Sequence, residues 1–202
     1  MPDTVTLGRE VPSLPSEYDM RWHIWWRTLR SMNSVSLEPR VTRPVMPDGY
    51  GVPEQDDGLL PWSWAVERLE HARLYWFSTV RADGRPHAMP AWAVWLDGAL
   101  YFDGSPETLR LRNLAARPDL VVQVQNAADE VVILEGQGLP ASKPSSELGQ
   151  RLADAFAAKY GESHDYRPAP DQWDNGGLWI MRPTKAFGWG EFPTSVTRWI
   201  FA

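Results

Sequence analysis

The sequence predicts a mainly β domain of the α+β class, in which roughly six to seven mostly antiparallel strands close a small barrel flanked by helices. Its central stretch contains three runs rich in aromatic and β-branched residues, at 72–80, 87–96 and 99–103. Asp83-Gly84 follows the first run, and Asp97-Gly98 separates the last two. Asp-Gly pairs tolerate positive φ where a chain reverses, so both predict hairpin turns. Successive hairpins make an antiparallel meander, and closure of a barrel removes its exposed edges.

The composition fits one globular domain with a substantial core: 202 residues, 43% hydrophobic and 23% charged. A net charge of −6 opposes any general affinity for nucleic-acid phosphate. No apolar run is long enough to span a membrane, and no signal-peptide layout is present. The absence of cysteine excludes disulfides and thiolate chemistry. We therefore expect a cytoplasmic protein without nucleic-acid or membrane partners.

Residues 1–58 are expected to form an N-terminal extension, and residues 59–202 the barrel domain. Pro12 and Pro15 break any helix in the first stretch. Asp19 can cap a short Trp-rich helix over 20–32. Residues 33–58, rich in Pro and Gly, predict a surface linker. The extension is expected to lie over the barrel or a partner subunit, with a membrane-surface helix as the alternative.

The remaining elements follow from local patterns. Ser63 can cap a helix that runs to about His71. A helix over 109–116 is expected to end at Arg117-Pro118, because a residue before proline avoids the helical region. Residues 146–160 place apolar side chains on one helical face. Further strands are expected at 120–125, 131–138, 177–182, 185–191 and 197–201.

The segment after the third strand is a candidate anion site. Hydroxyl, amide and guanidinium side chains gather where a loop becomes a helix, at Ser105, Thr108, Arg110, Arg112 and Asn113. Helix N-terminal N–H groups favour negative charge, and arginine offers paired donors to phosphate. The alternative is a solvated helix start whose arginines pair with Glu107 and Asp103.

The stretches RADGRPHAMPAWAVWLDGALYF and SPETLRLRNLAARPDL together resemble the pyridoxamine 5'-phosphate oxidase-like superfamily of flavin- and deazaflavin-binding split barrels. The resemblance runs from about Leu60 to the C-terminus and looks closest to the actinobacterial branch, many of whose members bind the deazaflavin F420 in place of FMN. It implies a homodimer with cofactor sites at the subunit interface. It also implies that the candidate anion site grips the cofactor's phosphate. Glu107 and Leu109 stand where many relatives have basic residues.

The resemblance assigns further residues to the cofactor and the substrate. It places the second strand under the cofactor ring, with His87, Met89, Pro90 and Trp92 as candidates. It makes Trp189 and Arg198 candidates for covering the ring and orienting an anionic substrate. A proton could come from solvent, His87 or Tyr75. The alternatives are a hydrogen-bonded structural role for His87, a surface ion pair for Arg198 and a core role for Trp199.

The function expected from this resemblance is F420-dependent transfer of a hydride to a small conjugated or activated organic acceptor. The alternatives are an FMN-dependent oxidase or reductase of the same fold and a non-catalytic barrel that binds a flavin, haem or tetrapyrrole. Twelve tryptophans fit core and interface packing as well as a flat slot for a flavin-like ring. His23 and His164 lack ligand spacing to partners, so no metal site is expected.

Overall fold

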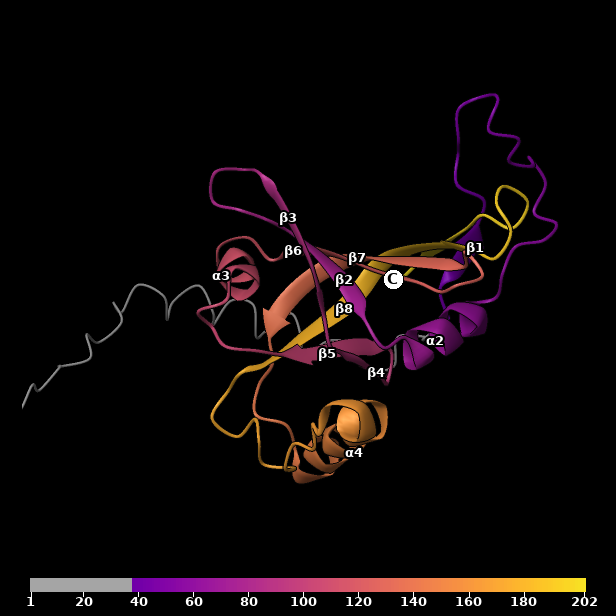
Figure 1. Cartoon of the computed structure of the whole chain (residues 1–202). Coiled ribbons are helices and arrows are strands. Elements are labelled where there is room, and N and C mark those ends of the chain that lie inside the picture. Colours follow the sequence, from indigo (N-terminus) through magenta and orange to yellow (C-terminus); the bar gives the residue numbers. More distant parts are fainter. Residues whose placement is uncertain (1–37) are drawn as a thin grey trace, which may run out of the picture. The chain divides into compact units, whose positions relative to one another are not determined.

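The computed structural model describes residues 38–202, in which nine strands and three helices form one sheet-dominated body (Figure 1). The predicted extension up to residue 37, including the helix over 20–32, lies outside the described residues. The strands are β1 (Arg40–Thr42), β2 (Tyr75–Val80), β3 (Pro86–Ala91), β4 (Val94–Leu96), β5 (Ala99–Asp103), β6 (Asp119–Gln125), β7 (Val131–Pro140), β8 (Leu178–Trp189) and β9 (Thr197–Ile200). The helices are α2 (Trp62–His71), α3 (Leu109–Ala116) and α4 (Ser146–His164).

The antiparallel sheet closes on itself through one broken strand. Neighbouring strands run β3-β2-β6-β7-β8, and the first half of β8 pairs with β5, which pairs with β4. Because β3 continues along the chain into β4, these segments complete a ring. The second half of β8 pairs instead with β9, and β9 with β1. The fold is therefore a split barrel, as the sequence predicts.

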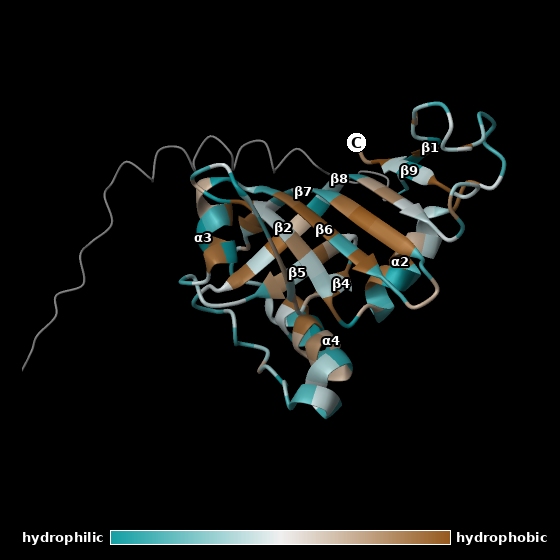
Figure 2. Cartoon of the chain, turned by 45° about the horizontal axis from the view of Figure 1, so that its top comes forward, coloured by the Kyte–Doolittle hydropathy of each residue, from teal (hydrophilic) through white to brown (hydrophobic). Residues whose placement is uncertain are grey.

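One row of side chains across the sheet forms the centre of the core. Paired positions join Phe77, Val122, Leu134, Ala186 and Trp199, all fully buried. The larger core cluster adds apolar residues from α2 and α3 to this row. A second cluster lies between α4 and the β4–β5 hairpin. Figure 2 shows hydrophobic residues along the middle strands and hydrophilic ones in the connecting loops.

Both predicted hairpin turns are confirmed. Gly84 has a φ of 86°, and Asp97 and Gly98 have φ values of 51° and 71°. These positive values are those that Asp-Gly pairs tolerate most readily. The helix predicted over 109–116 is found with the same bounds.

Other boundaries differ from the predictions for identifiable reasons. The predicted strand over 87–96 is broken at Trp92 and Ala93, because the hydroxyl of Tyr160 on α4 bonds both the N–H and the carbonyl of Ala93. The two strands predicted over 177–191 are one strand, β8, which continues through Pro183 opposite an irregularity at Gly136. The predicted linker contains β1.

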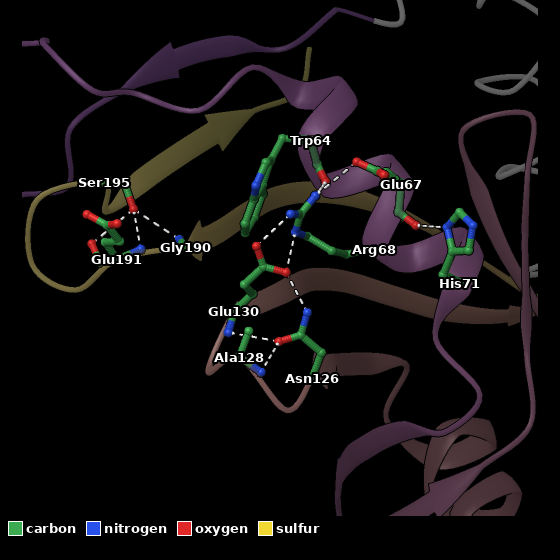
Figure 3. Close-up of polar contacts among 10 residues, drawn as sticks. All are labelled: Trp64, Glu67, Arg68, His71, Asn126, Ala128, Glu130, Gly190, Glu191 and Ser195. Carbon is green, nitrogen blue, oxygen red and sulfur yellow. Dashed lines mark hydrogen bonds and ion pairs between the residues drawn. The ribbon is translucent and has the colours of Figure 1, made fainter.

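An ion pair joins α2 to the β6–β7 turn (Figure 3). The Arg68 guanidinium donates to both oxygens of Glu130, at 3.1 and 2.6 Å, and lies 3.8 Å from the ring centre of Trp64. Asn126 donates to the same carboxylate. His71 contacts the Glu67 carbonyl at 2.7 Å in the last turn of the helix. These polar groups satisfy one another, so we assign them to the fold.

Candidate functional site

Buried polar side chains gather where α3 meets β2. Four polar or charged residues are buried in the described part of the chain, and three of them are Thr79, Arg110 and Asn113. The Asn113 amide donates to the Thr79 hydroxyl at 3.0 Å, and that hydroxyl lies 3.4 Å from Nδ1 of His87 on β3. The hydrogen bonds thus connect one helix and two strands. We call Thr79, His87, Arg110 and Asn113, with Arg81, the α3 polar cluster.

The guanidinium of Arg110 lies inside the barrel. It is 4.8 Å from the ring centre of Phe77 and 5.3 Å from that of Phe102. Nη2 donates to the Asp103 carbonyl at 3.0 Å, whereas Nε and Nη1 are buried without a hydrogen-bond partner. Desolvation lowers the pKa of Arg110 from its ordinary value, and the charge of Asp103 partly opposes this shift. Buried donors of this kind cost free energy unless an acceptor reaches them.

Arg81 is the second arginine with an unpartnered buried nitrogen. Its Nε and the two nitrogens of Arg110 are the only buried side-chain atoms without a partner in the part of the chain that the structure describes. Arg81 directly follows β2 and, by strand alternation, lies on the same face as Thr79. Within residues 38–202, the buried side-chain donors without a partner are therefore confined to Arg110 of α3 and to Arg81, which directly follows β2.

The first turn of α3 carries no side-chain cap. The Thr108 hydroxyl donates to the Ser105 carbonyl at 2.9 Å instead of accepting from the helix, and Ser105 Oγ accepts from Glu107 N–H. In contrast, Ser145 accepts from Leu148 N–H at the start of α4. Helix N-terminal N–H groups without a cap favour an anion. Ser105 and Thr108 thus leave the start of α3 uncapped.

The structure does not bring Arg110 and Arg112 together. Residues two apart on a helix point in nearly opposite directions, and Arg110 is buried whereas Arg112 is exposed. Glu107 is exposed before the first turn. The two guanidiniums therefore lie on different sides of α3: Arg110 lies in the barrel, where Nη2 donates to the Asp103 carbonyl, and Arg112 lies in solvent.

The free edge of β3 presents an unusual set of backbone groups. Arg81 N–H donates to the Arg85 carbonyl, so these two residues form a hydrogen-bonded pair. Along two antiparallel strands, hydrogen-bonded and non-hydrogen-bonded pairs alternate, so this pair sets the type of every other pair between β2 and β3. Pro86, Ala88 and Pro90 therefore occupy the non-hydrogen-bonded pairs, and their backbone groups point to the open edge. Because proline has no N–H, this edge offers three carbonyls but only the Ala88 N–H. Such an edge resists pairing with another strand and can bind a ligand that mainly donates.

The other predicted residues lie in different surroundings. On β3, the Met89 side chain is half-buried on the inner face of the sheet and Pro90 is exposed on the outer one. Trp92 stacks on Tyr160 of α4, with ring centres 4.9 Å apart. Tyr75 is buried in the larger core cluster, where its hydroxyl donates to the Leu69 carbonyl of α2.

The inner face of the sheet is the one that carries the buried row of Phe77 to Trp199, and the outer face is the opposite one. Trp189 and Arg198 lie on the outer face. Arg198 Nε donates to Thr42 Oγ1 at 3.0 Å, and Trp189 contacts Phe192 edge to face. Trp199 is fully buried and donates from Nε1 to the Leu60 carbonyl. The core role considered for Trp199 is thus confirmed.

Sequence reasoning missed Thr79 and Arg81. Thr79 lies in β2 and Arg81 directly follows it, and the pattern of this stretch predicts only a strand. A signal was present, because a hydroxyl and a guanidinium two residues apart lie on the same face at the end of a strand. The apolar pattern of α3 also indicates that Arg110 and Asn113 share the face of Leu114.

The chain thus combines a split barrel with buried, unpartnered guanidinium nitrogens and a helix start that carries no side-chain cap. The family described as pyridoxamine 5'-phosphate oxidase matches residues 65–190. This match covers more than half of the 202 residues, and the chain belongs to this family. A search among curated proteins finds no match.

Solved structures share the fold at low sequence identity. The conserved hypothetical protein Rv2991 from Mycobacterium tuberculosis is 17% identical, with a TM-score of 0.54 over 68% of this chain and 89% of its own. A putative 5-nitroimidazole antibiotic resistance protein from Bacteroides thetaiotaomicron is 12% identical, with a TM-score of 0.50 over 80% and 93%. An F420 reductase is 21% identical, with a TM-score of 0.44 over 70% and 98%. These likenesses concern the fold and assign no cofactor.

No helix among residues 38–202 is long and apolar enough to cross a membrane. The same residues contain no group of three or more His, Asp or Glu side chains arranged to hold a metal ion.

Proposed function

We propose that this protein is a flavin-type oxidoreductase that uses F420, with FMN as the alternative cofactor. The observation that carries the proposal is the pair of cationic side chains, Arg81 and Arg110, whose buried N–H groups lack acceptors. A phosphate oxygen is an acceptor whose charge and geometry suit such guanidiniums. Membership of the pyridoxamine 5'-phosphate oxidase family supports the same reading.

Each part of the cofactor has residues on this chain that suit it. Arg110, Arg81 and the uncapped start of α3 would hold the phosphate. His87 and Asn113 would extend the polar wall of the α3 polar cluster. The open edge of β3, with the Ala88 N–H between carbonyl groups, would bond the polar edge of the ring.

When bound, a reduced deazaflavin or flavin supplies a hydride to an acceptor held against its ring. The chain's own task is then to bind, orient and exclude water. Such a site needs no acid–base constellation of its own. His87, whose ring lies at the α3 polar cluster, is the better placed of the two proposed proton donors.

A second copy of the chain would complete the site on the outer face of the sheet. Paired positions there form a row of Trp76, Gln123, Ile133, Phe187 and Arg198. Neither core cluster includes Trp76, Ile133 or Phe187, and the Trp76 side chain is 46% exposed. An apolar row flanked by an arginine is typical of subunit interfaces. We propose that Arg198 and Trp189 act from this face toward the partner's ligand.

One observation favours FMN over F420. The exposed carboxylate of Glu107 lies at the start of α3, where it weakens the field for a long polyanionic tail. A compact phosphate monoester needs only the two guanidiniums.

The test is a parallel fluorescence titration of the purified protein with F420 and FMN. Micromolar or tighter binding of F420 alone would support deazaflavin chemistry. A preference for FMN would move the protein to the alternative. Binding of neither cofactor would contradict the proposal.

A further inference from the structure

The chain contains only three lysines, and they are chemically unequal. Lys143 is paired with Asp174 at 2.6 Å, and Lys185 with Glu135 at 3.0 Å. Lys159 makes no salt bridge with any residue in the described part of the chain. It is thus the one lysine whose charge has no carboxylate partner within residues 38–202.

Two neutral groups accept hydrogen bonds from the amine of Lys159, and the charged side chains of Glu70 and Arg73 lie close enough to affect its pKa. Its Nζ donates to the Tyr75 hydroxyl at 2.9 Å and to the Ala93 carbonyl at 3.5 Å. The nitrogen lies 5.1 Å from the centre of the Tyr75 ring, which is fully buried. An ammonium has three N–H groups, so one of them remains available. Lys159 is half-buried and not fully enclosed.

These surroundings favour the neutral amine. Burial lowers the pKa of Lys159 to about 8, Glu70 raises it and Arg73 lowers it further. A lysine amine attacks electrophiles only when it is neutral, and desolvation in an apolar site is a recognised way of producing that form. At neutral pH, a larger fraction of Lys159 is therefore nucleophilic than of a lysine with an ordinary pKa.

We propose that Lys159 is a site of covalent acylation by small acyl donors, namely thioesters and acyl phosphates. Its neutral Nζ attacks the acyl carbon and forms an amide bond. The carbon–sulfur or carbon–oxygen bond breaks, and the thiolate or phosphate departs with the electron pair. The proton that the nitrogen loses passes to solvent. No oxidant or reductant is needed.

Acylation would affect the contact between α4 and the break between β3 and β4. The amide keeps one N–H but loses the positive charge, and its added bulk must fit between Tyr75 and Ala93. The same Ala93 is bonded by Tyr160, so the modification lies at the point where α4 holds the β3–β4 break. We expect it to weaken the packing of α4 without removing any residue of the α3 polar cluster.

The experiment incubates the full chain with acetyl phosphate at pH 7.5 and follows the three lysines by peptide mass spectrometry. We expect Lys159 to be acetylated at least about tenfold faster than Lys143 and Lys185, because its neutral fraction is larger. A parallel arm with acetyl-coenzyme A separates thioester from acyl phosphate donors. Equal or slower labelling of Lys159 in both arms would overturn the proposal.

Two controls separate the folded environment from other causes. In urea, where all three lysines are solvated, the preference should vanish, and its persistence would contradict the structural explanation. Lys159→Arg, which keeps the charge and cannot be acylated under these conditions, should resist the reagent while its melting temperature stays near that of the wild type. A drop in melting temperature on acetylation of the wild type, absent in Lys159→Arg, would support the expected effect on α4.

Discussion

Arg110 illustrates at the scale of one residue how a stable fold can retain an unfavourable group. The residue is 4% exposed, and its guanidinium rests on two aromatic rings and leaves two nitrogens without acceptors. Cation–π contact offsets only part of the desolvation cost. A buried cation that lowers stability is the kind of group expected at a binding site, in line with the proposed phosphate contact.

Replacing Arg110 should weaken cofactor binding while sparing the fold. We expect Arg110→Met to lower affinity roughly ten- to hundredfold, because hydrogen bonds to charged groups contribute about 1.5–3 kcal/mol. Without cofactor, its melting temperature should equal or exceed that of the wild type. Arg112→Met, on the exposed side of the same helix, is the matched control and should bind normally. Titration and thermal melting check both statements, and equal losses in the two variants would contradict them.

Lys159 predicts a pH dependence of stability. Its folded-state pKa is lowered to about 8 whereas the unfolded chain keeps the ordinary higher value, so the unfolded state binds more protons between these values. Stability from this group therefore rises as pH increases above about 8. Compared with Lys159→Met, the wild type should gain melting temperature between pH 7 and 9.5. A difference that is independent of pH would refute the assignment.

At the scale of elements, sequence patterns predicted the helix ends and turns that depend on neighbouring residues. The bounds of α3 and both Asp-Gly turns depend on proline, glycine and apolar spacing, and they were predicted correctly. The break between β3 and β4 could not be predicted, because it depends on Tyr160, which lies 67 residues from Ala93 in sequence. Likewise, β1 forms only because β9 is available to pair with it.

The link between α4 and the β3–β4 break can be tested with a single hydroxyl. Tyr160→Phe leaves the buried N–H of Ala93 without its acceptor, which costs about 1–3 kcal/mol. For a chain of this size, that lowers the melting temperature by roughly 2–4 °C per kcal/mol. Tyr101→Phe removes the same atom from a buried tyrosine without a hydrogen bond of its own among the described contacts, and serves as the control. Equal stability of the two variants would exclude a structural role for the link.

At the scale of the whole molecule, the predicted site residues divide into separate groups. Asn113 and His87 both contact Thr79, and Arg110 lies one turn before Asn113 on α3. Trp92 instead packs on α4, and Arg198 lies on the outer face of the sheet. Sequence order could not reveal this division, because it follows from how the sheet curls. The apolar face of α3 could have predicted that the Arg110 side chain points into the barrel. The burial of Arg81 Nε could not be predicted in this way, because it depends on how α3 packs on β2.

The outer face supports a prediction about assembly. Phe187→Lys places a second positive charge opposite Arg198 in the outer row and should convert a dimer to a monomer, because burying an unpaired charge is costly. Val45→Glu changes a side chain that is 93% exposed in the loop after β1 and is the matched control. Light scattering coupled to size exclusion measures the molar mass of each. A wild-type monomer, or a dimer in both variants, would contradict this assembly.

The most direct test of the central claim compares ligands that differ only in the phosphate. The affinities of FMN and riboflavin, and of F420 and the same deazaflavin without its phosphodiester tail, should be measured for the wild type and for the Arg81→Met/Arg110→Met double variant. We expect the phosphate-bearing ligand to bind the wild type at least tenfold more tightly, as a charge-assisted contact of about 1.5–3 kcal/mol requires, and the double variant to lose this preference. Equal binding of both ligands to the wild type would show that the α3 polar cluster does not bind phosphate.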